Sequence, residues 1–133
     1  MAVSTNSIQV TWGGSNSTSV AAGGTANSDT ITFSDSAIYA ELMVKADNEG
    51  TPADGDTLDV YLQKIADPDA DSSNDTESTG TFLVQLDTYG DADPSVRVIS
   101  IPVGFANARL HVENNAGSNA ITVSATITEK TSS

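Results

Sequence analysis

The sequence predicts an all-β protein, a single antiparallel β-sandwich domain over residues 1–133, jelly-roll-like and built from about eight strands. Apolar residues alternate with polar ones in nearly every apolar segment, and a period of two is typical of half-buried strands. Gly, Pro, Asn and Asp separate these segments at short intervals. No segment has a helical period, which favours two packed antiparallel sheets over a parallel sheet with crossover helices. An immunoglobulin-like Greek key is the alternative topology, because strand number alone does not fix connectivity.

The first third of the chain predicts three strands separated by glycine pairs. Their ranges are Ser7–Trp12, Ser17–Ala22 and Asp29–Phe33. Their inward-facing residues are Ile8, Val10, Trp12, Ile31 and Phe33. Gly13-Gly14 and Gly23-Gly24 lack the lysine and the strand-to-helix context of a phosphate-binding loop, so we interpret both pairs as turns.

The segment Ala37–Ile65 predicts a β-hairpin around which the rest of the chain packs. Apolar residues alternate on both sides of a polar turn, Asp47–Asp56. The residues expected to face inward are Ile38, Ala40, Leu42, Val44 and Ala46 before the turn, and Leu58, Val60 and Leu62 after it. Two strands with one apolar face each must meet a second sheet.

The second half of the chain predicts four more strands. Their ranges are Thr81–Leu86, Ser95–Ile101, Ala108–Val112 and Ile121–Thr128. We expect Phe82, Val84 and Leu86 to face inward. In Ser95–Ile101 the apolar residues fall on both faces, so this strand is either covered on both sides or carries a bulge.

Charge excludes several classes of partner. Eighteen acidic and five basic residues give a net charge of −13, and such a surface repels the phosphates that dominate nucleic-acid binding. We expect no nucleic-acid partner and no membrane association, since no segment approaches the length of a membrane span. The chain starts with neither a basic nor an apolar run, so we expect a soluble protein without a classical export signal. It contains no cysteine, so thiol catalysis is excluded.

We predict no catalytic residue, no cofactor and no metal, and therefore no enzyme. The loop after the predicted hairpin spaces its acids like a calcium site: Asp67, Asp69, Asp71, Asp75 and Glu77. However, Ser72 and Ser78 stand where an EF-hand has its glycine and its final glutamate, which favours a solvated acidic loop. His111 is the one histidine and is expected on the polar face of its strand, between Arg109 and Glu113.

Apolar side chains on predicted outer faces are the candidate interface. They are Tyr39, Met43, Tyr61 and Leu83, with Ile99 on a later strand. Scattered exposed apolar residues are normal, but a contiguous group indicates an interaction surface. A symmetric oligomer, a dimer or trimer, could bury such a group.

Three segments resemble small structural proteins that tailed bacteriophages encode beside their capsid genes. The segments are Lys45–Leu62 (KADNEGTPADGDTLDVYL), Ile8–Gly14 (IQVTWGG) and Asn114–Val123 (NNAGSNAITV). The resemblance implies a capsid decoration, or cement, protein that binds the major capsid protein on the virion exterior after synthesis in the bacterial cytoplasm. It carries over no functional residue. A carbohydrate-binding or host-adhesion sandwich of a phage fibre or tail is the alternative. Besides the phenylalanines, its possible aromatic platforms are Tyr39, Tyr61, Tyr89 and Trp12, of which we expect Trp12 in the core.

Overall fold

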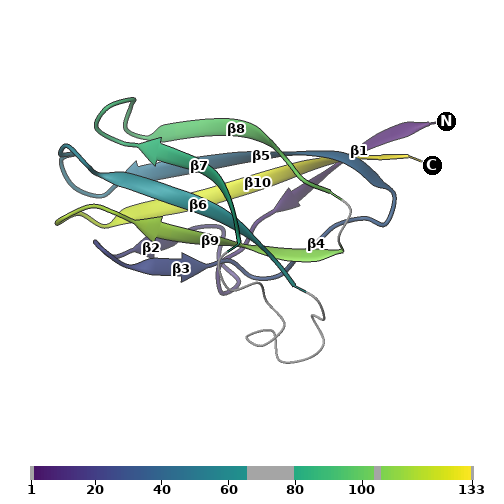
Figure 1. The fold of residues 1–133 in the computed structure, drawn as a ribbon, viewed down its shortest axis with the longest axis horizontal. Coiled ribbons are helices and arrows are strands. Elements are labelled where there is room, and N and C mark those ends of the chain that lie inside the picture. The colour runs from purple at the N-terminus through teal and green to yellow at the C-terminus, as the bar shows by residue number, and fades with distance from the viewer. Residues whose placement is uncertain (1, 66–79, 104–105, 133) are drawn as a thin grey trace.

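The computed structural model describes residues 2–65, 80–103 and 106–132, and its ten strands form two facing antiparallel sheets (Figure 1). Sheet A contains β1 (Val3–Gln9), β2 (Thr18–Val20), β5 (Ala37–Asn48), β8 (Ser95–Ile101) and β10 (Ile121–Ser132). Sheet B contains β3 (Thr25–Asn27), β4 (Ile31–Thr32), β6 (Thr57–Lys64), β7 (Thr81–Asp87) and β9 (Asn107–Asn114). The described residues contain no helix, so the predicted all-β sandwich is confirmed.

The order of the strands is that of a jelly roll. β1 and β2 pair with successive parts of β10, and β3 and β4 pair with successive parts of β9. Each of these pairs therefore counts as one interrupted strand, which leaves eight strands in two sheets of four: β1/β2-β10-β5-β8 and β3/β4-β9-β6-β7. This arrangement matches the predicted jelly roll rather than the immunoglobulin-like alternative.

The predicted hairpin over Ala37–Ile65 is wrong. β5 pairs with β10 and β8 in sheet A, whereas β6 pairs with β7 and β9 in sheet B. The polar segment between them crosses from one sheet to the other at the end of the molecule opposite the two termini (Figure 1). Alternation correctly places Leu42 and Leu58 inside, but it does not show which strands pair with each other.

The core lies between the sheets and consists of aliphatic side chains from both. Leu42, Val44, Ile121 and Ile127 project from sheet A, and their counterparts in sheet B include Leu58, Val60, Leu86, Leu110 and Val112, all fully buried. Each such side chain contributes roughly 1.5 to 3 kcal/mol when it leaves water. The two predicted strands with the cleanest alternation, in β9 and β10, have every apolar residue on the expected face.

Two local irregularities displace predicted inward residues. Val60 pairs with Val84 but Tyr61 pairs with Phe82, so Leu83 is an extra residue in a β-bulge. The bulge reverses the alternation, which exposes 54% of Phe82 and packs Leu83 against the core. A second register shift lies between Lys130 and Thr131, opposite β5, and there Ile38 is exposed instead of buried.

Strand β8 follows neither of the two interpretations offered for Ser95–Ile101. It pairs with β5 in one unbroken register and lies at the edge of sheet A. Ile99 and Ile101 face the core, so Ile99 is not the outward residue that we predicted. Val96 and Val98 face outward with 49% and 58% of their surface exposed.

The first third of the chain is more fragmented than predicted. The first strand begins at Val3 and ends at Gln9, although Val10 and Trp12 beyond it are buried as expected. Instead of one strand over Asp29–Phe33, two short strands flank Ser28. The Ser28 amide still donates to the Leu110 carbonyl at 2.8 Å, but the Leu110 amide donates to the Ser28 hydroxyl at 2.9 Å instead of to a backbone carbonyl.

We expect truncation of the core at β9 to be strongly destabilising. Leu110→Ala should lower the free energy of unfolding by about 2 to 5 kcal/mol, because it removes buried methyl groups and leaves a cavity. Val3→Ala, at a side chain that is 57% exposed, is the matched control and should change it by less than about 0.5 kcal/mol. Urea denaturation of both variants measures the difference, and similar values for the two would contradict the assigned core.

Candidate functional site

A buried carboxylate organises the end of the sandwich opposite the termini. Asp56 is 3% exposed, and its Oδ2 accepts hydrogen bonds from the Ala53 amide at 3.0 Å, Asn48 Nδ2 at 3.0 Å and Asn119 Nδ2 at 3.1 Å. The Asp56 carbonyl accepts two more from the amide and hydroxyl of Thr88. These donors, led by the Ala53 amide and then Asn48, lower the pKa of Asp56 below its ordinary value. The role of this group is structural.

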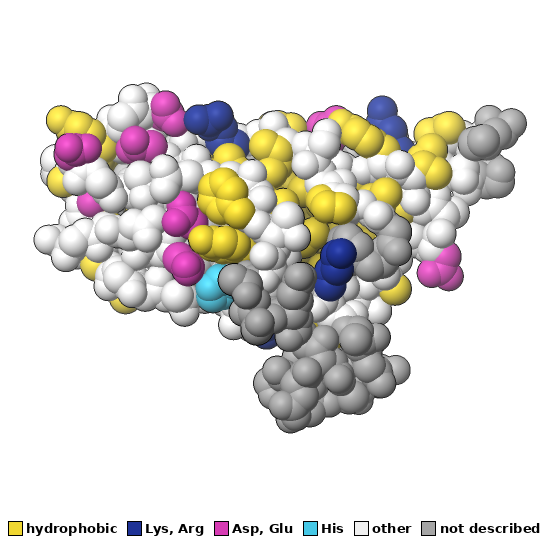
Figure 2. Space-filling view, in the orientation of Figure 1, with side chains coloured by type: hydrophobic (Ala, Val, Ile, Leu, Met, Phe, Trp, Pro, Cys, Tyr) yellow, Lys and Arg dark blue, Asp and Glu magenta, His cyan; other side chains and the backbone are white. Residues whose placement is uncertain are grey.

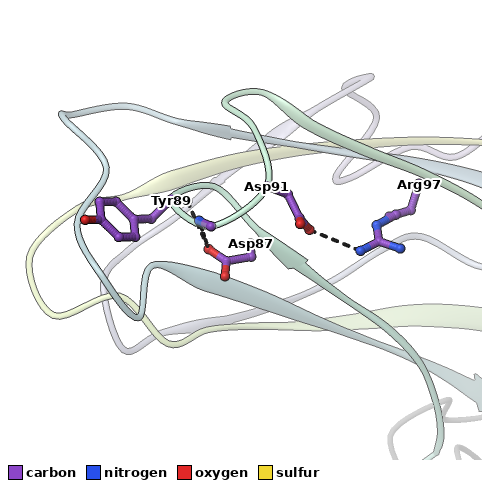
Figure 3. A network of polar contacts seen from close by, with 5 residues as sticks. Asp87, Tyr89, Asp91 and Arg97 are labelled. Carbon is purple, nitrogen blue, oxygen red and sulfur yellow. Dashed lines mark hydrogen bonds and ion pairs between the residues drawn. The ribbon is translucent and has the colours of Figure 1, made fainter.

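The loop between β7 and β8 lies at the same end and presents a tyrosine to solvent. Asp87 Oδ1 accepts hydrogen bonds from the amides of Tyr89 at 2.9 Å and Gly90 at 2.7 Å. Further along, Asp91 pairs with Arg97 at 3.1 Å. Figure 3 shows the Tyr89 ring pointing away from these contacts, and 58% of the side chain is exposed. Both ion-pair partners are about half exposed, so the pair contributes little stability.

The outer face of sheet A carries an apolar patch, which we name the sheet A patch: Tyr39, Met43, Val96 and Val98. Met43 lies directly between Val98 of β8 and Thr126 of β10. Beside it, a shallow hollow is lined by Met43, Lys45, Val96, Ser124, Ala125 and Thr126. The Tyr39 hydroxyl contacts Glu41 at 3.0 Å and Ser100 at 2.8 Å. Met43, Val96 and Val98 are therefore adjacent, whereas the polar pair Glu41 and Ser100 lies between them and Tyr39.

Charges around the sheet A patch nearly cancel. Lys45 and Lys130 project from this face, and the Lys130 ammonium lies 5.9 Å from the centre of the Tyr39 ring. Glu41 and Asp47 balance the two lysines. A near-neutral apolar face on a chain of net charge −13 is the part of this surface best suited to contact another protein.

The outer face of sheet B carries a row of rings beside a row of polar groups (Figure 2). Tyr61 lies between Phe82 at 5.6 Å and His111 at 5.9 Å, measured between ring centres. The neighbouring row is centred on Asp59, which accepts hydrogen bonds from Gln85 Nε2 at 2.8 Å and Asn115 Nδ2 at 3.1 Å. Partial burial, followed by the carboxylates of Glu113 and Asp59, raises the pKa of Tyr61 above its ordinary value.

The structure does not bring the four predicted interface residues together, and Leu83 faces inward instead of outward as predicted. Tyr39 and Met43 lie on the outer face of sheet A, and 39% and 47% of their surface is exposed. Tyr61 lies half-buried in the ring row of sheet B, and Leu83 is at the bulge, packed against the core. Because β5 and β6 belong to different sheets, the four residues do not form one patch; their participation in an interface stays a prediction.

His111 and the acidic loop are the remaining candidate groups from the sequence. His111 is on the outer face of sheet B, where its Nδ1 is 2.6 Å from Asn27 Oδ1 and its Nε2 is 3.8 Å from Glu113. The acidic loop from Asp67 to Glu77 falls outside the described residues. Among the residues that are described, no cluster of His, Cys, Asp and Glu could hold a metal ion. The same residues contain no helix that is long and apolar enough to cross a membrane.

Sequence reasoning missed Val96 and Val98 as exposed residues and placed Phe82 inside. The apolar residues on both faces of Ser95–Ile101 already indicated that one apolar pair would be exposed, because a strand in an antiparallel sandwich has one face in the core and one toward solvent. Phe82 gave no such signal, because a one-residue bulge leaves no mark in an apolar run.

Comparison with known proteins supports the fold and leaves function open. No family model and no curated protein matches the chain. Among solved structures, it resembles the C-terminal family 6 carbohydrate-binding module of the laminarinase LamC from Zobellia galactanivorans, with 12% identity and a TM-score of 0.51 over 96% of this chain and 99% of that one. A family 115 4-O-methyl-α-glucuronidase matches with 12% identity and a TM-score of 0.50, over 94% of this chain and 16% of the enzyme. The acidic stable capsid structure of Helicobacter pylori bacteriophage KHP30 has 18% identity over 98% of this chain and 95% of that one, with a TM-score of 0.46. The first two likenesses show a shared β-sandwich fold, and the third is too distant to support a conclusion.

We expect Asp56 to make folding stability depend on pH. Its folded-state pKa is depressed, so its contribution is complete above the ordinary pKa of 3.8 and is lost as pH falls through the lower folded-state value. The free energy of unfolding of wild type should therefore exceed that of Asp56→Asn at pH 7, and the gap should close below about pH 4.

Asp54→Asn is the control for this experiment, because Asp54 is exposed in the same connection and its removal changes the net charge equally. Urea denaturation from pH 7 to 2 measures all three proteins. A constant gap between wild type and Asp56→Asn over that range would contradict the assigned role.

Proposed function

We propose that this protein is a non-enzymatic virion structural protein that binds the outer surface of a bacteriophage capsid and stabilises it. The observation that carries the proposal is the sheet A patch, in which Tyr39, Met43, Val96 and Val98 form an apolar, near-neutral face on an otherwise acidic domain. The resemblance of Lys45–Leu62 and two other segments to phage structural proteins supplies the kind of partner, the major capsid protein.

Charge supports an exterior position. A domain of net charge −13 would be repelled by packaged DNA on the inside of the shell. On the outside, the capsid lattice presents the same site many times, so an oligomer of this domain would engage several sites at once. Linked weak contacts then give a long-lived attachment without any single tight one.

A second candidate function, glycan binding, is favoured by the outer face of sheet B. Phe82 is 54% exposed beside Tyr61, and an exposed ring offers the apolar face against which a sugar ring packs. Asp59, Gln85 and Asn115 already form a hydrogen-bonded row next to it, and such fixed polar groups orient a ligand. In this function the domain would be an adhesion module of a fibre or tail.

Capsid binding should depend on sheet A. Met43→Asp should weaken binding to purified capsids of the encoding phage about tenfold or more, because it places a charge at the centre of an apolar contact. Phe82→Asp, a matched change on the opposite face, should leave binding unchanged. Co-sedimentation with capsids stripped of the protein measures both variants, and absence of wild-type binding would contradict the proposal.

Glycan binding should depend on sheet B. On a glycan array, a positive signal for wild type that Phe82→Ala lowers about three- to tenfold would support this second function, since the lost stacking is worth about 0.5 to 1.5 kcal/mol. Met43→Asp is the control and should retain the signal. No signal on the array, together with capsid binding, would support the first function and contradict the second.

A further inference from the structure

The edge of sheet A at β8 lacks the protection that edge strands usually have. β8 pairs with β5 on one side, and no strand of the described residues pairs with it on the other. An edge of this kind is normally short, interrupted by a bulge or proline, or covered by charged side chains. β8 has seven residues, a regular register, no proline and one charged side chain, Arg97.

Two of the other three edges differ from β8 in these respects, and the third, β1, matches it in length and regularity but presents mostly polar side chains. β7, at the edge of sheet B, carries the bulge at Leu83 and ends in Asp87. At the opposite edges, β2, β3 and β4 have two or three residues each. β1 is longer, but its middle residues Ser4–Ser7 are all polar. Among these edges, β8 alone combines length, regularity and apolar outward side chains.

We propose that β8 is the seam of a symmetric dimer, in which the β8 strands of two copies pair antiparallel and join two A sheets into one. An antiparallel pairing of a strand with its own copy is isologous, so it consumes both edges and closes at two copies. This inference does not depend on capsid binding.

Charge favours a second copy at this edge. Two chains of net charge −13 repel each other over most of their surfaces. The segment Ser95–Ile101 contains no acidic residue, Arg97 is paired with Asp91, and the adjoining sheet A patch is near neutral. The seam strand therefore contributes no acidic side chain of its own, and the charge of Asp91, which contacts it, is paired with Arg97.

The sequence of β8 also fixes one register. Val98 is the middle residue, so a two-fold axis through it pairs all seven residues and sets Val98 opposite its own copy. Val96 then faces Ser100, and Arg97 faces Ile99, so no like charges stand opposite each other. An axis through Arg97 would set two guanidinium groups opposite each other and pair fewer residues.

Pairing in this register would extend the sheet A patch across the seam. Val98 lies beside Met43 on the outer face, so the order across the dimer becomes Met43, Val98, Val98 of the second copy and its Met43. The outer faces of both copies stay on the same side, because paired residues in an antiparallel ladder point in the same direction. The dimer thus presents one continuous apolar face of twice the size.

Cysteine cross-linking tests both the dimer and its register, because the natural chain contains no cysteine. In Val98→Cys the two sulfurs would meet at the axis, where opposite Cα atoms lie about 4.5 to 5.5 Å apart, within the range that a disulfide spans. In Val96→Cys, an equally exposed position on the same face, the two residues would be offset by four positions, roughly 14 Å along the strand. We expect Val98→Cys to oxidise to a covalent dimer more than about tenfold faster.

Sedimentation velocity supplies the second measurement. Wild type should sediment as a dimer at micromolar concentration, and Val98→Asp should sediment as a monomer with an unchanged circular dichroism spectrum, because two carboxylates would face each other at the axis. A wild-type monomer would overturn the proposal. Equal cross-linking rates for the two cysteine variants, or a Val98→Asp dimer, would overturn the seam at β8.

Discussion

The hydrogen bonds of Asp56 join parts of the chain that strand pairing leaves unconnected. At this end of the jelly roll, each of four connections passes from one sheet to the other: β2 to β3, β5 to β6, β7 to β8 and β9 to β10. Asp56 lies in the second connection and is bonded to Thr88 in the third and Asn119 in the fourth. Asn114, which is 2% exposed, reaches the first through the carbonyl of Val20.

Buried polar groups of this kind give specificity as well as stability. Each is fully satisfied in one arrangement of the four connections, and an unpaired carboxylate or amide would carry the full cost of desolvation. The connection that contains Gly50 also lies very close to the Asn119 side chain, since a Cβ on Gly50 would lie 2.5 Å from Asn119 Oδ1. The network therefore selects the sandwich in which the sheets are registered at this end, and the faces and edges follow from that registration.

Much of the fold could be predicted because alternation reports directly on burial. Leu42, Leu110 and Ile121 face the core as their spacing requires. Strand partners could not be predicted in the same way, since a ten-residue polar connection fits either a hairpin or a crossing between sheets. The Leu83 bulge could not be predicted either, because it depends on the partner strand and not on the local sequence.

The candidate site was predicted in part for the same reason. Tyr39 and Met43 were identified as exposed, since β5 alternates regularly there. Because the predicted hairpin placed β5 and β6 in one sheet, Tyr39 and Met43 were wrongly expected on the same face as Tyr61. Val96 joins Met43 only through tertiary pairing of β5 with β8, and Thr88 and Asn119 reach Asp56 only through contacts between distant segments. Side chains that meet across neighbouring strands can be predicted only when the order of the strands in the sheet is known.

Charge is distributed unevenly between the outer faces of sheet A and sheet B. At physiological ionic strength charges act over about 8 Å, so a partner responds to the local face and not to the total of −13. Sheet B presents Asp59 and Glu113 beside its rings, which suits a neutral ligand rich in hydroxyl groups. Sheet A balances Lys45 and Lys130 against two acids around apolar side chains, which suits protein. If the proposed dimer and capsid contact form, the high total charge would keep other faces apart and direct contact to the face and edge where repulsion is weakest.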